Sequence, residues 1–310
     1  MAIIAILESW DPGVTAAVVA AIVSVITLIL GAPLRMWVER HLQTFRLKSE
    51  YESEQRKELR SLIGRYHGRL VAAAESFHQR LSNLYVYEDR RWLDSPESDF
   101  KDRRWLDSHD SYYFKTTQYR FLCVCSLARA FEREAYFIDS RIAEPSDFDF
   151  LKFIKAFLWA TTSAALFKDL RYDETKNTDH FFADQIREIC DQFCSSSNTC
   201  LSFGEFEQSL RETDTFDAVG EFFHGLHASE ARLRWDRLVA YDLMLMAFLG
   251  TVGYETQHPA NAKLSEVAQR IRHPEIRRNM IGRLANLGLD RQQEMKRVTA
   301  ALVSAGLPQA

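Results

Sequence analysis

Glycine and proline are scarce in this sequence of 310 residues, which has 12 Gly and 7 Pro. Few stretches alternate between apolar and polar residues as strands do, whereas apolar residues recur at spacings of three and four along most of the chain. Hydrophobic residues make up 46% of the chain and aromatic residues 12%, which supports a packed core and argues against disorder. We therefore predict an all-α protein.

The sequence also has none of the motifs that mark common cofactor enzymes, such as a Gly-rich phosphate loop, HExxH, GxSxG or the kinase set. We therefore predict no catalytic residue, no cofactor and no metal ion, and we favour a non-enzymatic protein. An enzyme without a recognisable motif is a further alternative. It would need a concave polar pocket where charged side chains converge.

Charge is missing altogether from Gly13 to Ala32, twenty residues of which ten are Val, Ile or Leu. Twenty helical residues extend about 30 Å, the thickness of the hydrocarbon core of a bilayer. The alternative, a buried helix of a soluble core, is disfavoured because such helices are usually shorter or amphipathic. We predict a single transmembrane helix over residues 13–34.

Lys and Arg are absent before this apolar run, where Glu8 and Asp11 lie instead, so a cleaved signal peptide is not expected. By the positive-inside rule, residues 1–12 lie outside and the rest of the chain lies in the cytoplasm. The predicted location is the bacterial inner membrane, crossed once. The basic residues that set this orientation follow the apolar run directly: Arg35, Arg40, Arg46 and Lys48.

The predicted membrane helix has one face of small residues, which fall within a narrow arc at 100° per residue. Small faces let helix backbones approach closely in lipid. We predict that the chain forms a homo-oligomer through this helix, although small residues are also common in membrane helices that do not associate. The predicted association face consists of Gly13, Ala16, Ala20, Ser24, Thr27 and Gly31.

A long stalk helix is predicted over residues 35–87. Apolar residues recur in it at spacings of three and four from Leu59 to Leu84, forming a stripe that needs a partner. The partner is either a later helix of the same chain or a second copy. Residues 33–83 carry ten basic and six acidic side chains, which suits an anionic leaflet better than nucleic acid.

The heptapeptide DRRWLDS occurs twice, at residues 89–95 and 102–108. Pro, Ser and Asp are frequent around both copies, so we predict a loop over residues 88–110. Trp92 and Trp105 are candidate docking anchors for a protein partner. A tolerated surface insertion is the alternative, and the one that we favour.

Residues 111–310 are predicted to form a cytoplasmic α-helical domain. Residues 145–171 are rich in Phe and apolar around most of the helix, so this helix should lie centrally. The stretch from Leu238 to Tyr254 is the only other membrane candidate. Because it has seventeen residues and contains Asp242, we interpret it as a buried core helix.

Acidic residues in apolar contexts are expected to form salt bridges or buried polar contacts rather than a catalytic pair. Asp173, Glu174 and Lys176 have the residue types of a nuclease carboxylate and lysine set, but such sets lie on a strand and these residues interrupt helices. The acidic residues in apolar contexts are Glu132, Glu134, Asp139 and Asp242.

The number of cysteines is odd, and all of them lie on the side predicted to be cytoplasmic, where thiols stay reduced. We therefore predict no structural disulfide. Three of them, together with His180, have the residue types of a metal site, but only the Cys190-x3-Cys194 gap has the usual spacing, so we favour free cysteines. The five are Cys123, Cys125, Cys190, Cys194 and Cys200.

The helix predicted from about residue 111 to 139 carries a pattern made of Tyr113, Phe114, Lys115, Thr116, Thr117, Tyr119, Glu132, Arg133, Tyr136, Phe137, Ile138 and Asp139. This pattern resembles one in uncharacterised bacterial proteins that pair an N-terminal membrane helix with a helical cytoplasmic domain. The resemblance implies that architecture only, with no activity, cofactor or catalytic residue. The chain departs from the pattern in its doubled heptapeptide.

These features predict a membrane-anchored helical scaffold or sensor that acts by self-association or partner binding, without enzymatic activity. The expected partners are the lipid bilayer, further copies of the chain and a protein partner, and not nucleic acid. The alternative is a membrane-perturbing effector of a bacterial stress or phage-defence system that oligomerises through its transmembrane helix. Overexpression of such an effector would dissipate the membrane potential.

Overall fold

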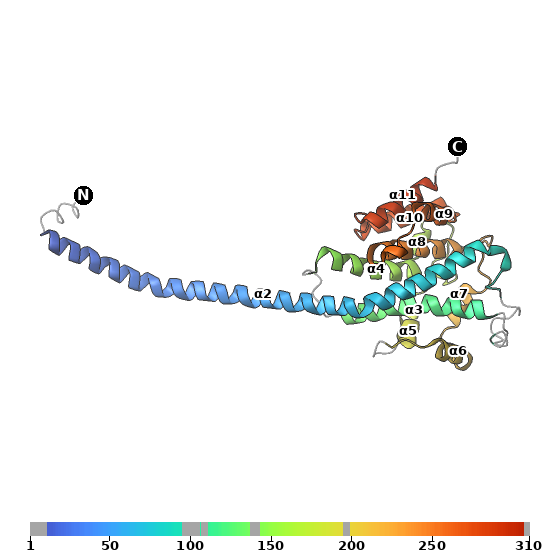
Figure 1. Cartoon of the computed structure of the whole chain (residues 1–310), viewed down its shortest axis with the longest axis horizontal. Coiled ribbons are helices and arrows are strands. Elements are labelled where there is room, and N and C mark those ends of the chain that lie inside the picture. Colours follow the sequence, from blue (N-terminus) through green and yellow to red (C-terminus); the bar gives the residue numbers. More distant parts are fainter. Residues whose placement is uncertain (1–10, 95–105, 107–110, 137–142, 195–198, 307–310) are drawn as a thin grey trace. The chain divides into compact units, whose positions relative to one another are not determined.

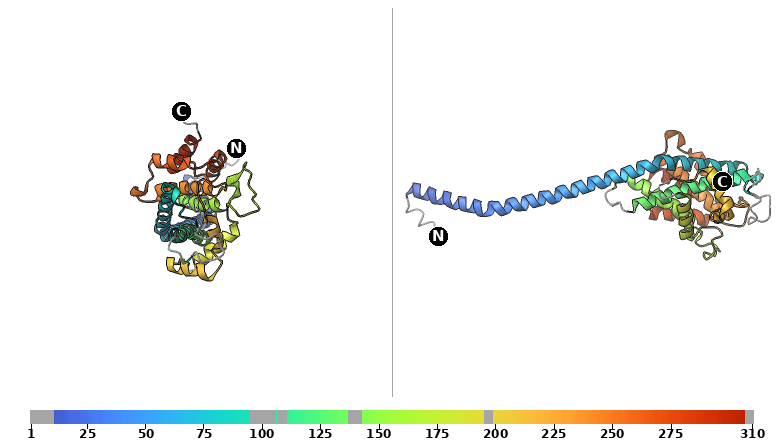
Figure 2. Two further views of the ribbon diagram at one scale, coloured as in Figure 1. Left: turned by 90° about the vertical axis from the view of Figure 1, so that its right-hand side faces the viewer. Right: turned by 90° about the horizontal axis from the view of Figure 1, so that it is seen from below.

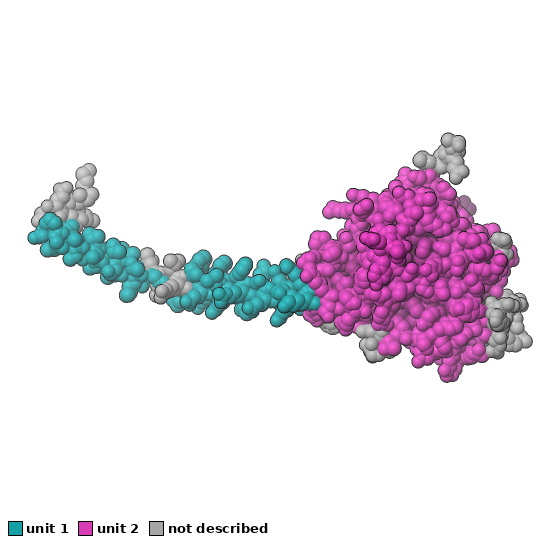
Figure 3. Space-filling view, in the orientation of Figure 1, with its two compact units in different colours: residues 1–57 teal, residues 58–310 magenta. Residues whose placement is uncertain are grey.

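The computed structural model describes residues 11–94, 106, 111–136, 143–194 and 199–306, without the side chains of residues 30, 32–35 and 89. Every regular element in these ranges is a helix, which confirms the all-α prediction. The chain divides into two compact units, residues 1–57 and 58–310, which Figure 3 colours separately.

The first described helix, α2 (Pro12–Val86), joins the predicted membrane and stalk segments in one helix of 75 residues. Residues 34–86 contain no Pro and only two Gly, so little in this sequence interrupts a helix. Within the first unit, Pro12–Ile29 is long and apolar enough to cross a membrane, and none of it is buried. No other described helix meets that requirement of length and composition.

In the second unit, the apolar stripe of α2 is buried, with Leu70 and Phe77 at 0% exposure. Its partner is therefore the same chain. One covering helix is α3 (Tyr112–Ala135), which lies beside α2 in Figures 1 and 2. The two helices run antiparallel: residues later in α2 contact residues earlier in α3. The contacts join Tyr66 to Glu134, Ser76 to Arg120 and Arg80 to Thr116.

The helix α8 (Arg234–Val252) forms the centre of the second unit, and every residue from Arg234 to Gly250 is buried. The ring of Tyr241 in α8 packs against Phe77 of α2, with ring centroids 6.0 Å apart, and against Phe157 of α4 (Pro145–Thr162), at 5.7 Å. The prediction of a buried core helix is confirmed. It contains an ionisable side chain, Asp242, which is fully buried.

Local sequence signals explain several helix ends. A capping box between Glu144 and Asp147, followed by Pro145, starts α4. The helix α10 ends just before Gly288, whose φ of +64° lies in the left-handed region that favours glycine. Helices α9 to α11 lie on one side of α8, and α5 and α6 on the other (Figures 1 and 2). The remaining elements are η1 (Glu88–Arg90), η5 (Ala164–Phe167), α5 (Ala183–Phe193), α6 (Phe203–Glu212), α7 (Asp217–Phe223), η6 (Glu255–Gln257), α9 (Asn261–Gln269), α10 (Pro274–Asn286) and α11 (Gln293–Ser304).

Candidate functional site

The predicted association face lies on the first unit of α2, and none of its six residues is buried. The hydroxyls of Ser24 and Thr27 donate hydrogen bonds of 2.7 Å to the carbonyl oxygens of Ala20 and Val23, within the helix. The face therefore offers a small surface whose polar groups already have partners. A side chain added at Gly31 would meet nothing within 4 Å, so packing inside the chain does not require a glycine there.

The same helical arc continues beyond the apolar window as larger side chains. At 100° per residue, Val38, Leu42 and Phe45 fall in the arc of the small residues. They are 40, 49 and 67% exposed. Leu47 is also 67% exposed but lies nearly opposite Phe45 on the helix. Sequence reasoning missed this continuation because it followed the arc only to the end of the apolar run.

Of the two tryptophans proposed as docking anchors, the structure describes Trp92. Trp105 lies outside the described residues. Trp92 follows η1 and packs against Tyr113 with ring centroids 4.1 Å apart, and against Tyr87 at 5.2 Å. The guanidinium of Arg90 also lies over its ring. Much of the Trp92 ring is therefore in contact with the chain itself.

Cys194 and Cys200 form a disulfide, so the prediction of no structural disulfide is wrong for this pair. Cys194 caps the C-terminus of α5, and its backbone pairs with Cys200 in an isolated antiparallel bridge, with Cα atoms 3.9 Å apart. The backbone N–H of Leu201 also donates to the carbonyl of Phe193 at 3.0 Å. Sequence reasoning missed the pair because it assigned reduced thiols from the compartment and did not foresee this local backbone pairing.

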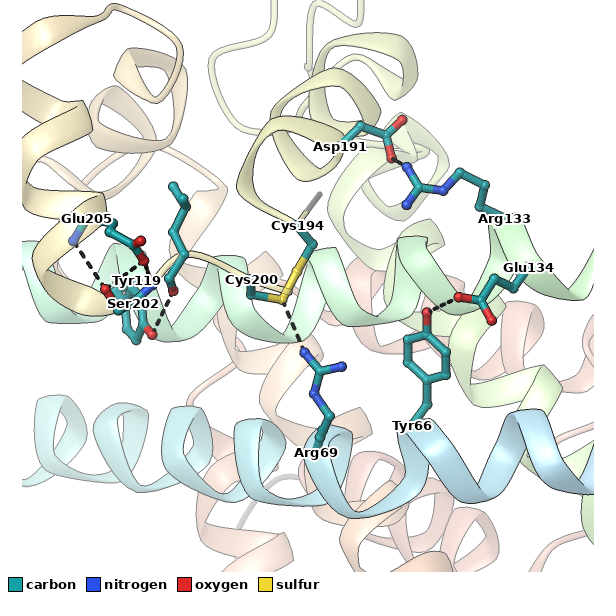
Figure 4. The surroundings of a disulfide bond; sticks show 11 residues. Tyr66, Arg69, Tyr119, Arg133, Glu134, Asp191, Cys194, Cys200, Ser202 and Glu205 are labelled. Carbon is teal, nitrogen blue, oxygen red and sulfur yellow. Dashed lines mark hydrogen bonds and ion pairs between the residues drawn. A yellow bond between two sulfur atoms is a disulfide. The ribbon is translucent and has the colours of Figure 1, made fainter. Parts of the chain in front are cut away.

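The two sulfur atoms of this disulfide have different surroundings (Figure 4). Cys194 is 1% exposed, whereas Cys200 is partly exposed. Arg69 of α2 reaches toward Cys200, and its Nη2 lies 3.8 Å from the Sγ atom. A guanidinium favours a nearby thiolate, and Arg69 lies beside the sulfur of Cys200.

The other three cysteines are free thiols; Cys125 and Cys190 are buried, and Cys123 is partly buried. Burial raises the pKa of Cys123 to about 11 and that of Cys190 to about 12. Burial also raises the pKa of Cys125 well above its ordinary value. These thiols are protonated and unreactive at neutral pH.

A second candidate site is the pair formed by His78 and Asp242. The Nδ1 atom of His78 on α2 lies 2.7 Å from Oδ1 of Asp242 on α8. The aspartate is fully buried, and the histidine side chain is 20% exposed. Burial disfavours the imidazolium, but the charge and hydrogen bond of Asp242 outweigh it and raise the pKa of His78 above its ordinary value. The two residues are 164 positions apart, so no sequence motif announces them.

His78 lines a cavity of about 210 Å³ between α2, α8 and the segment after α8. Glu75, Gln257, His258 and Lys263 also line it, and the amide of Gln257 donates to Glu75 at 2.7 Å. A histidine oriented by a carboxylate can exchange protons and bind anions. This is the converging polar pocket that an enzyme would need, although its described lining contains neither Ser nor Cys.

A larger cavity of about 370 Å³ lies between the end of α3 and α4. Its lining includes Phe131, Ile154 and two lysines, Lys152 and Lys155. Lys152 donates to the carbonyl of Gly288 at 2.9 Å, so it fastens α4 to the end of α10. We assign this cavity no ligand.

Two further charges on α8 hold loops in place. Arg237 is buried and donates to the carbonyl oxygens of Asp179, Ala160 and Ser163. Burial lowers its pKa to about 9. Asp236, fully buried, accepts hydrogen bonds from the backbone and guanidinium of Arg272. Both groups are buried and bonded to loop residues of the same unit, so we interpret them as structural.

The carboxylates singled out in the sequence form the expected polar contacts where they are described. Glu134 accepts from Tyr66, and Glu132 pairs with Arg129 at 3.0 Å. Asp139 lies outside the described residues. Asp173 pairs with Lys176 at 3.3 Å in an exposed, non-helical segment.

Comparisons with known protein families, with curated proteins and with solved structures found no match.

Proposed function

We propose that this protein is a membrane-anchored helical scaffold or sensor that acts by self-association through α2. The observation that carries the proposal is one helical arc of described residues on its first unit, none of them buried. Six small residues lie on one arc of the apolar segment, and Val38, Leu42 and Phe45 extend the same arc. In this proposal the apolar segment crosses a bacterial inner membrane with the second unit in the cytoplasm.

Lipid covers only part of this face. The apolar window ends at Ile29, and Phe45 lies sixteen residues further, or about 24 Å along a helix. Exposed Leu42 and Phe45 therefore require a cover other than the hydrocarbon core. Burying such side chains is worth about 1.5–3 kcal/mol each.

A second copy of the chain is the occupant that matches both parts of the face. The membrane fixes the direction of every copy, so two α2 helices associate in parallel. In a two-fold arrangement each surface then meets its own equivalent. Inside the bilayer, the small residues of one copy pack against those of the other. The hydrophobic effect does not drive association in lipid, so van der Waals packing at close backbone approach stabilises the pair. Beyond the bilayer, Leu42 and Phe45 meet the same residues of the partner.

Single cysteines introduced into α2 test the proposal by crosslinking in native membranes. We expect Ser24→Cys and Phe45→Cys to give a covalent dimer, because these positions lie on the shared arc. Ile22→Cys and Leu47→Cys lie on the opposite side and should crosslink at least fivefold less. Leu47 is a matched control for Phe45, since both side chains are 67% exposed.

The starting chain for this experiment keeps its own cysteines, which lie in the second unit and report any background crosslinking. Ala20→Leu should reduce the Phe45→Cys dimer, because a larger side chain separates the backbones at the small face. Equal crosslinking at all four positions would contradict association through this arc.

A further inference from the structure

The disulfide between Cys194 and Cys200 conflicts with the compartment assigned to the second unit. Stable structural disulfides are rare in the cytoplasm, where disulfides are usually transient and catalytic or redox-sensing. The conflict disappears if the bond is made and broken in the working protein. A reversible dithiol needs two thiols held close together and one of them open to solvent.

The backbone holds the two cysteines together independently of the sulfur bond. The Cys194 N–H donates to the carbonyl of Cys190 at 2.9 Å, and the Leu201 N–H donates to that of Phe193 at 3.0 Å. The ring of Phe193 packs against Tyr119 and Phe206, which fixes the end of α5 next to the start of α6. Reduced thiols in this frame stay close enough to reoxidise.

The two positions also divide the chemical roles. Cys200 is partly exposed and has the guanidinium of Arg69 3.8 Å from its sulfur (Figure 4). It therefore has both the access and the cation that favour a reactive thiolate. Cys194 is buried, which suits a thiol that reacts only with its neighbour. An accessible cysteine beside a cation and a resolving cysteine is the usual arrangement of peroxide-sensitive sites.

We propose that Cys200 is a peroxide-oxidation site, with Cys194 as its resolving cysteine and a hydroperoxide as substrate. The Cys200 thiolate attacks the terminal oxygen, an S–O bond forms, and the O–O bond breaks. The leaving hydroxide or alkoxide takes up a proton. The Cys194 sulfur then attacks the sulfenic sulfur, the S–S bond forms, and water leaves with the Cys194 proton. Two thiols and hydrogen peroxide give one disulfide and two waters, and a dithiol reductant reverses the change.

This inference rests on the cytoplasmic location of the second unit in the proposed function, but not on self-association through α2. It concerns oxidation of a cysteine in the second unit, whereas the crosslinking experiment concerns the first unit. A negative crosslinking result therefore does not contradict the oxidation site. A negative oxidation result likewise does not contradict self-association.

The test uses the full chain in detergent, reduced with dithiothreitol and then freed of it. One equivalent of hydrogen peroxide should convert Cys194 and Cys200 to the disulfide, while the other three cysteines stay available for alkylation. In Cys194→Ser, dimedone should label Cys200, because the sulfenic acid has lost its resolving partner. Mass spectrometry of peptides reads both results.

Arg69→Gln should slow alkylation of reduced Cys200 by iodoacetamide about tenfold at pH 7, because the guanidinium that lies 3.8 Å from the sulfur no longer stabilises the thiolate. Arg65→Gln is the matched control. Arg65 lies on the same helix one turn earlier and pairs with Glu134 at 2.8 Å, so its loss should leave the rate unchanged. An equal effect of the two substitutions contradicts the role of Arg69.

Trapping of thiols by acid quench in intact cells completes the test. We expect the pair to be mainly reduced in unstressed cells and oxidised within minutes of peroxide addition. A bond that is fully formed in unstressed cells, or that resists dithiothreitol in the folded protein, overturns the proposal. Dimedone labelling of Cys123 or Cys190 instead of Cys200 overturns it as well.

Discussion

Replacing Asp236 with alanine should lower the free energy of unfolding by about 3 kcal/mol, because it removes a fully buried carboxylate and leaves the partly exposed Arg272 without its ion-pair partner. Asp236 is fully buried, and its carboxylate lies 2.6 and 2.9 Å from Nη2 and Nε of Arg272. It also accepts from the backbone N–H of Arg272 at 2.5 Å. Urea unfolding of the detergent-solubilised chain, followed by near-ultraviolet circular dichroism, measures the loss.

Two comparisons separate the buried charge from a general effect of substitution. Asp236→Asn keeps the shape and part of the hydrogen bonding, so it should cost less than Asp236→Ala. Asp290→Ala removes an exposed aspartate and should change the free energy of unfolding by no more than about 0.5 kcal/mol. A loss at Asp236 as small as that at Asp290 would show that Arg272 finds other partners, such as the carbonyls of Ala228 and Arg232 that it already contacts.

Replacing His78 with alanine should cost about 3 kcal/mol, because the fully buried carboxylate of Asp242 loses its hydrogen-bonding partner. The same unfolding measurement applies. The double variant His78→Ala, Asp242→Leu removes the unpaired carboxylate as well. It should recover part of the free energy of unfolding lost in His78→Ala. His227→Ala is the control, since His227 bonds only to the nearby hydroxyl of Ser229 and should cost about 0.5 kcal/mol or less.

The contribution of His78 should also depend on pH. Its pKa is raised in the folded chain, so folding favours the imidazolium. The stabilisation is fully present below the ordinary histidine pKa of about 6.5 and is lost as the pH rises through the raised value. The difference in unfolding free energy between the native chain and His78→Asn should therefore be larger at pH 6 than at pH 9. A difference that is constant or grows with pH contradicts this assignment.

Most of the helical class and several individual helices were predictable, because amphipathic spacing and capping signals are local. The stripe from Leu59 to Leu84 follows from apolar residues that repeat every three or four positions, whereas the apolar helix from Pro12 and the buried helix at Leu238 follow from the length and charge of their apolar runs. Periodicity could not show whether the stripe packs within the chain or against a second copy. Burial of Leu70 and Phe77 against the rest of the second unit shows that it packs within the chain.

The candidate sites depended on contacts that no local pattern encodes. His78 and Asp242 are 164 residues apart, and they meet only because α2 and α8 pack together in the core. Arg69 and Cys200 are 131 residues apart and meet in the same way. The cysteine pair is close in sequence, but its bond depends on a backbone bridge after α5 that cysteine spacing does not reveal.

Residue type and spacing along one helix were enough to identify the apolar segment from Gly13 to Ala32, its small-residue arc and the helical class. The buried charges and the paired thiols, in contrast, became visible only in the folded chain. Those outcomes depend on distances between helices, which are set by the packing of side chains from distant parts of the chain.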